Sequence, residues 1–183
     1  MIALGSSSST RAKILKDAHI DFIQRAYEFD ESAVKDKNAY ELIYKIAKGK
    51  AARYLEIYPL DMPFVVADTV VVAGGKILGK AQDIDEAREM LLLQSNNSVS
   101  IATCMIYKSL RLEFIDLSVT SYEFDRFKND DLEIYLESNE WQGKAGACMV
   151  EGFCKPYIKS VHGFESTAMG LSIEKLLPFL ELG

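Results

Sequence analysis

Residues 62–80 constrain the fold of this chain more than any other stretch. They read MPFVVADTVVVAGGKILGK, so an apolar run surrounds one acid, Asp68, and glycines and lysines follow it. Apolar and β-branched residues from Phe64 to Ala73 predict a buried strand. Because an unpaired buried carboxylate is costly, Asp68 needs a metal, a hydrogen-bond donor or a cation.

The alternative is that Asp68 is a turn acid at a strand end, bonded by backbone N–H groups. Two neighbouring motifs, Gly74-Gly75-Lys76 and Gly79-Lys80, favour a functional role for Asp68 instead. They bring cations and bare glycine backbone back toward the acid.

Composition and charge exclude several classes of protein. With 183 residues the chain suits one large domain or two small lobes, and its net charge of −6 argues against a nucleic-acid surface. Three cysteines without a CxxC pair indicate a reducing compartment. We find no signal peptide and no apolar stretch of membrane-spanning length, so we expect a cytoplasmic protein without membrane contact.

The N-terminal stretch predicts an anion site. A short apolar run, residues 1–4, precedes a Gly/Ser loop at residues 5–10, and residues 11–18 have helical spacing. Serine hydroxyls and the N–H groups of a helix start bind anions, and Arg11 in the first turn suits a bound phosphate. A flexible serine-rich linker is the alternative.

The remaining pattern predicts helices at residues 39–58, 83–93, 129–136 and 171–180, with Asp83 and Glu86 as a capping box for the second helix and Asn129-Asp130-Asp131 as a cap for the third. It predicts strands at residues 22–23, 99–107, 112–124 and 157–161, and a loop at residues 163–167. On the first of these helices we expect Lys50 to extend from the apolar face to solvent, and the alternative is that it reaches into a cleft. The acids Glu28, Asp30 and Glu31 form a cluster typical of solvated surface, with metal binding as the alternative.

Standard nucleotide and hydrolase signatures are missing. The chain has no GxGxxG motif, Gly79-Lys80 is followed by Ala81, and two histidines give no readable Ser-His-Asp set. What remains is two acids, Asp68 and Glu31, with several cations and a serine-rich helix start; the cations are Arg11, Lys50, Lys80 and Lys144. This set suits metal-assisted attack of water on a phosphoanhydride.

A series of short blocks resembles the Maf family of nucleotide pyrophosphatases, in family order across nearly the whole chain. The blocks are LGSSSSTR at 4–11, DE at 30–31, KA at 50–51, ADTVV at 67–71, GK at 79–80, WQGKAG at 141–146, EG at 151–152 and GL at 170–171. The resemblance implies one Maf-like domain over residues 1–183. It also implies an α/β fold similar to inosine triphosphate pyrophosphatases, with an elongated mixed sheet flanked by helices and two lobes around a central cleft.

The resemblance further implies the reaction and its residues. The family hydrolyses nucleoside triphosphates to monophosphate and pyrophosphate with a divalent metal, Mg²⁺ or Mn²⁺. Its members often form homodimers and were first linked to septum formation. Asp68 falls on the presumed proton acceptor and Glu31 on an acid near the metal, and both are expected to hold the ion. The cations Lys50, Lys80 and Arg11 fall on phosphate-binding positions, beside Ser6, Ser7 and Ser8.

The chain departs from the family pattern at positions that differ between members with different nucleobase preferences. Members of the dTTP/UTP type carry Pro-Arg-Arg where this chain has Ser9-Thr10-Arg11, and Gln where it has Glu151. Glu151 resembles the 7-methyl-GTP type, but that type usually has Trp at the position of Thr10 and lacks Thr69. Cys148 replaces an expected aromatic residue.

We therefore expect a nucleoside triphosphate pyrophosphatase for non-canonical or modified nucleotides. Thr10, Thr69 and Glu151 are the predicted base-specificity residues. The alternative from another class is a non-catalytic nucleotide-binding regulator of cell division.

Overall fold

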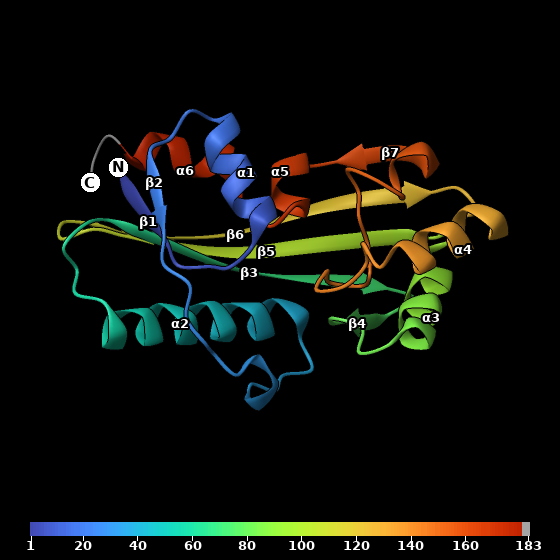
Figure 1. The fold of residues 1–183 in the computed structure, drawn as a ribbon, viewed down its shortest axis with the longest axis horizontal. Helices are drawn as coiled ribbons and strands as arrows, with labels where there is room; N and C mark the ends of the chain where they lie inside the picture. Colours follow the sequence, from blue (N-terminus) through green and yellow to red (C-terminus); the bar gives the residue numbers. More distant parts are fainter. Residues whose placement is uncertain (181–183) are drawn as a thin grey trace. The chain divides into compact units, whose positions relative to one another are not determined.

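The computed structural model describes residues 1–180 (Figure 1). Its helices are α1 (Ser9–Asp17), α2 (Ala39–Ile57), α3 (Ile84–Gln94), α4 (Asn129–Ser138), α5 (Glu165–Ala168) and α6 (Ile173–Leu180), with short 3-10 turns at Glu31–Ala33 and Lys155–Tyr157. Its strands are β1 (Ile2–Leu4), β2 (Phe22–Gln24), β3 (Phe64–Ala73), β4 (Lys76–Leu78), β5 (Ser98–Lys108), β6 (Glu113–Phe124) and β7 (Ile158–His162).

The strands form one mixed sheet in the order β2-β1-β3-β5-β6-β7, with β4 paired to β3. Strand β1 runs parallel to β2 and β3, with Ala3 opposite Ile23 and Phe64. The pairs β3–β4 and β6–β7 are antiparallel. The predicted mixed α/β sheet is confirmed.

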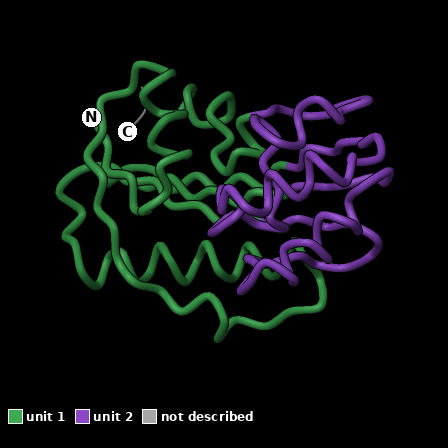
Figure 2. Tube along the Cα trace, turned by 45° about the vertical axis from the view of Figure 1, so that its right-hand side comes forward, with its two compact units in different colours: residues 1–69, 102–118, 166–183 green, residues 70–101, 119–165 purple. Residues whose placement is uncertain are grey.

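The chain forms two compact units (Figure 2). Unit 1 comprises residues 1–69 and 102–118 and the C-terminal segment from Ser166, and unit 2 comprises residues 70–101 and 119–165. The strands β3, β5 and β6 each contribute residues to both units.

In unit 1 the helices cover both faces of the sheet. Helix α2 lies on one side, and α1 and α6 lie on the other (Figure 1). The core on the α1/α6 side is made of fully buried residues that include Leu4, Leu15, Val65, Tyr107 and Leu171. Burial of these side chains, at about 1.5–3 kcal/mol each, stabilises the layers around the site described below.

In unit 2 the helices α3 and α4 are joined by an ion pair between Arg88 and Glu133. The predicted cap of α3 is confirmed, because Asp83 Oδ1 accepts from the Glu86 backbone N–H at 2.8 Å. The Glu86 carboxylate bonds the backbone N–H of Gln82 rather than that of Asp83, so the reciprocal half of the capping box is displaced by one residue.

Two sequence-based predictions of local structure are wrong, and one short strand was not predicted. The expected loop at residues 163–167 contains α5, which is too short to show a helical period. Helix α4 begins at Asn129, with Lys128 at its N-cap and no side-chain cap bond, so Asn129 is not its cap. The glycine turn after β3 is followed by strand β4, whose three residues gave too short a pattern to recognise.

Candidate functional site

Because side chains alternate along β3, its two polar residues, Asp68 and Thr69, lie on opposite faces of the sheet. Side chains at positions two apart share a face. Phe64 stacks on Tyr54 of α2 with ring centroids 4.2 Å apart, so Asp68, four residues later, points to the α2 side. Val65 belongs to the core on the α1/α6 side, and Thr69 points that way.

On the α2 side Asp68 is part of a compact charged group. The Lys50 Nζ lies 2.6 Å from Asp68 Oδ1 and 2.7 Å from Glu31 Oε1. The side chains of Lys50 and Asp68 are only 12% and 9% exposed, and that of Glu31 is 32% exposed. We call these three residues the acid–lysine cluster. Asp68 is therefore not a turn acid at a strand end, because it lies inside β3 and a lysine compensates its charge.

The expectation that Lys50 extends to solvent is wrong. Helix α2 buries Ile43, Ile46, Ala47, Ala51 and Tyr54. Lys50 lies seven residues after Ile43 and four after Ile46, so it belongs to the buried stripe. In the sequence, the four-residue spacing between Ile46 and Lys50 is the signal that Lys50 faces inward.

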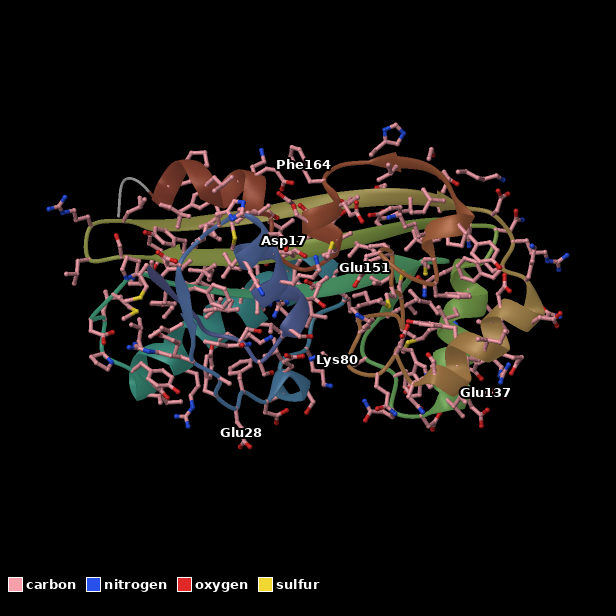
Figure 3. All side chains as sticks on the ribbon, turned by 45° about the horizontal axis from the view of Figure 1, so that its top comes forward. Asp17, Glu28, Lys80, Glu137, Glu151 and Phe164 are labelled. Atoms are coloured by element: carbon pink, nitrogen blue, oxygen red, sulfur yellow. The ribbon has the colours of Figure 1, made fainter. Side chains whose placement is uncertain are left out.

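The acid–lysine cluster offers two carboxylates to a divalent ion. Oxygens of Asp68 and Glu31 both reach one point, the Lys50 nitrogen. Mg²⁺ is usually held by one or two carboxylates, with phosphate oxygens and water completing the shell, so the donor set fits it. Within residues 1–180 no group of three or more metal-ligating side chains converges. Of the neighbouring acids, Asp30 accepts from the Ser32 N–H at 2.9 Å, and Glu28 is exposed (Figure 3).

The serine-rich loop, residues 5–8, precedes α1, which begins at Ser9, two residues before the predicted start at Arg11. Ser8 is the N-cap of α1, and its Oγ accepts from the Arg11 backbone N–H at 3.3 Å. The Ser6 Oγ accepts from the Ser8 N–H at 3.2 Å. In both bonds the serine oxygen is the acceptor, so the hydroxyl proton can be donated to an anion. Ser7 is exposed, and Thr10 is half-buried in the first turn of α1.

The Arg11 guanidinium is fixed by three parts of unit 1. Its Nε donates to the Gly170 carbonyl at 2.8 Å, one Nη to Ser6 Oγ at 3.1 Å and the other to Thr69 Oγ1 at 3.4 Å. Burial lowers the pKa of Arg11 below its usual range, and the charges of Asp68 and Glu31 oppose this shift. An arginine remains protonated under any such shift, so Arg11 is a fixed cation near the two acids.

Gly170 is required where Arg11 docks. Its φ is +101°, and a Cβ there would lie 3.1 Å from Thr69 Oγ1 and 3.3 Å from Arg11 Nε. Its carbonyl holds Arg11 across 159 residues of sequence. The GL block at 170–171 marked the position, but no local pattern indicated that its carbonyl receives the arginine.

In unit 2 the Gly79-Lys80 and Lys144-Ala145 segments lie side by side. Lys80 and Ala145 form an isolated antiparallel bridge, and the Gly146 N–H donates to the Gly79 carbonyl at 2.7 Å. The buried Gln94, which sequence reasoning missed, donates from Nε2 to the Gly146 carbonyl at 2.7 Å. Gly146 has φ +62°, and a Cβ there would lie 2.9 Å from Val71 Cβ. The Gly79-Lys80 and Lys144-Ala145 segments are thus held in one arrangement.

The loop after α4 carries Glu151, whose side chain is shown in Figure 3. Glu151 Oε1 lies 3.5 Å from Lys144 Nζ. Two cysteines flank Glu151, and the Sγ atoms of Cys148 and Cys154 are 3.4 Å apart. The contact with Cys154, burial and the charge of Glu151 together raise the pKa of Cys148 well above its ordinary value.

The chain is similar to known proteins over nearly its whole length. The model of the Maf family, described as Maf-like protein, matches residues 1–182. A nucleoside triphosphate pyrophosphatase of a Nitratiruptor species is 53% identical over 178 residues, which are 96% of each chain. Proteins of the same name from Helicobacter pylori (strain J99 / ATCC 700824) and Campylobacter jejuni (serotype O:23/36, strain 81-176) are 41% and 36% identical, covering 100% and 98% of this chain and 96% and 100% of their own.

Among solved structures, a nucleoside-triphosphatase / dITP/XTP pyrophosphatase from Mycobacterium abscessus resembles this chain. It is 11% identical, with a TM-score of 0.45, and the match covers 99% of this chain and 94% of that one.

Proposed function

This chain belongs to the Maf family, and we propose that it is a nucleoside triphosphate pyrophosphatase. In the proposed reaction the oxygen of water bonds to the α-phosphorus, and the bond from that phosphorus to the bridging oxygen breaks. Pyrophosphate leaves, and a nucleoside monophosphate remains. The relatives compared above carry this activity in their names and match this chain over nearly its full length.

The observation that carries the proposal is the acid–lysine cluster. One oxygen of Asp68 accepts from Lys50, and its second oxygen is the proposed acceptor for the proton of the attacking water. A carboxylate held in place by a buried cation is suited to general-base work, which typically contributes 10²–10⁴-fold to the rate. Lys50 is also a proposed cation for the triphosphate, because charge develops on phosphoryl oxygens as the bond breaks.

A divalent ion, Mg²⁺ or Mn²⁺, completes the proposal. Asp68 and Glu31 would hold it, because both carboxylates contact the same Lys50 nitrogen and so lie next to each other, and one or two carboxylates are the protein ligands that Mg²⁺ usually takes. When bound, such an ion polarises phosphoryl oxygen and neutralises part of the triphosphate charge.

The serine-rich loop and Arg11 are the proposed phosphate site. The start of α1 presents backbone N–H groups and the positive end of the helix dipole. Ser6, Ser7 and Ser8 add hydroxyl donors. Within residues 1–180 three of the five guanidinium N–H groups of Arg11 make hydrogen bonds, so two donors can bind an anion.

The remaining roles concern the triphosphate and the base. Lys80 is a further proposed cation for the triphosphate. Glu151, with Thr10 and Thr69, is proposed to select the base, because a carboxylate accepts hydrogen bonds from base N–H groups. We propose non-canonical or modified nucleotides as the substrates.

The proposed compartment is the cytoplasm, and the cysteines support it. Three cysteines without a CxxC pair are typical of a protein in a reducing environment. No helix among the described residues has the length and apolar character to cross a membrane. A homodimer and a link to septum formation stay predictions.

A nucleotide panel tests the function. Wild-type protein with Mg²⁺ is incubated with dTTP, UTP, 7-methyl-GTP and ITP, and pyrophosphate and phosphate are detected separately. We expect pyrophosphate with the matching monophosphate. Release of phosphate alone, or nucleotide binding without turnover, would contradict the proposal, and the second result would favour a regulator.

The variant Asp68→Asn tests the proposed base. We expect a loss in kcat of about 10²–10⁴-fold, because the amide cannot accept the proton of water, with nucleotide binding largely kept, because the proposed cations for the triphosphate remain. Asp17→Asn is the matched control, since Asp17 pairs with Lys13 and its side chain is 60% exposed. Normal turnover in Asp68→Asn would show that the base is misassigned.

A further inference from the structure

Thr103 is a buried polar residue of unit 1 that sequence reasoning did not select. It lies on β5, next to β3 in the sheet, and its exposed fraction is 0%. Its Oγ1 donates to the Thr167 carbonyl at 2.7 Å and lies 2.8 Å from Thr69 Oγ1. A hydroxyl buried among apolar strands needs such partners, so both bonds constrain the Thr103 side chain.

These contacts determine which hydroxyl donates. A threonine hydroxyl has one proton, and Thr103 gives its proton to the Thr167 carbonyl. The proton in the 2.8 Å contact must therefore come from Thr69. The Thr69 oxygen is left as an acceptor, and it accepts from Arg11 at 3.4 Å.

Thr103 also stabilises the second acceptor of Arg11. The Thr167 carbonyl accepts from the Gly170 N–H at 3.0 Å as well as from Thr103, which closes the turn from Thr167 to Gly170. The carbonyl of Gly170 accepts from Arg11 Nε at 2.8 Å. One buried hydroxyl thus contacts both segments that hold the guanidinium.

We propose that Thr103 is a positioning residue for Arg11. Thr103 accepts a hydrogen bond from the Thr69 hydroxyl, so that the Thr69 oxygen is oriented as an acceptor for Arg11. Thr103 also fixes the turn that presents the Gly170 carbonyl. The remaining guanidinium N–H groups of Arg11 then face a phosphate in one orientation. The inference rests on the proposed function in so far as Arg11 binds phosphate.

Thr103→Val removes the hydroxyl at nearly constant shape, and Thr103→Ser restores it. Thr120→Val is the matched control. Thr120 is also buried on a strand, and its Oγ1 donates to a loop carbonyl, that of Phe164, at 2.6 Å. Thr120→Val therefore loses a similar bond without touching Arg11 or its acceptors.

The first readout is the rate of hydrogen exchange of the Arg11 Nε–H, measured by NMR. The Nε–H signal of Arg11 is assigned by its absence from the spectrum of Arg11→Lys. We expect slow exchange in wild-type protein, Thr103→Ser and Thr120→Val, and fast exchange in Thr103→Val. Equal exchange in Thr103→Val and Thr120→Val would overturn the proposal. This measurement needs no turnover. It therefore tests the role of Thr103 even if the wild-type protein releases no pyrophosphate and the proposed function is wrong.

The second readout is steady-state kinetics with the best nucleotide of the panel, with inorganic pyrophosphate as the inhibitor. We expect KM and the pyrophosphate inhibition constant of Thr103→Val to rise about tenfold to a hundredfold, the effect of one misplaced hydrogen bond to a charged group. The value of kcat should change much less, because a phosphate contact made in both ground and transition states acts on binding. A lower kcat at unchanged KM would contradict a positioning role.

Discussion

Removing the Lys50 ammonium is the sharpest test of the acid–lysine cluster. In Lys50→Met the stem of the side chain is kept, and Asp68, whose side chain is 9% exposed, loses the cation 2.6 Å away. Breaking a buried ion pair on one side costs about 3–5 kcal/mol, because the remaining charge stays buried without its direct partner. Glu31 adds under about 1 kcal/mol, since its side chain is 32% exposed and water screens it.

The assay is thermal and denaturant unfolding at neutral pH. For a chain of this size each kcal/mol lowers the Tm by roughly 2–4 °C, so we expect a decrease of roughly 6–20 °C. Lys48→Met is the control. Lys48 pairs with Glu113 at 3.3 Å, and its side chain is 44% exposed, so its loss should cost under about 1 kcal/mol.

A second readout uses the metal. With Lys50 removed, Asp68 and Glu31 face each other without their shared cation, and a divalent ion can replace it. Mn²⁺ should therefore raise the Tm of Lys50→Met more than that of wild-type protein, by the usual linkage of binding to stability. Equal stability of Lys50→Met and Lys48→Met would refute the reasoning, because it would mean that Lys50 does not compensate a buried charge.

Two further predictions concern backbone geometry and thiol ionisation. Gly170→Ala should lower affinity for pyrophosphate, because a Cβ at φ +101° would lie 3.3 Å from Arg11 Nε; calorimetric titration checks this, and unchanged affinity would contradict it. Alkylation of Cys148 by iodoacetamide should be slow at neutral pH and accelerate as the pH rises toward its raised pKa, since the thiolate is the nucleophile. Peptide mass spectrometry measures the rate, and a rate independent of pH would refute the assigned environment.

The sequence by itself determined the elements and most of the residue types at the site. Apolar periodicity predicted β3 and α2 closely, because such signals act within a few residues. The Gly/Ser loop followed by helical spacing predicted α1, although the helix begins at Ser9, two residues earlier than expected. The blocks around Asp68, Lys50 and Arg11 supplied the candidate residues. The structure places these three residues and Glu31 within unit 1.

The tertiary structure decided the partners. Alternation along β3 sends Asp68 to the α2 side and Thr69 to the α1 side, and only the packing of α2 shows that Lys50 reaches Asp68. Thr103 and the carbonyl of Gly170 carry no local signal for their roles. Their bonds join residues that are 64 and 159 positions apart, respectively, and such pairings depend on how strands and helices pack rather than on neighbouring sequence.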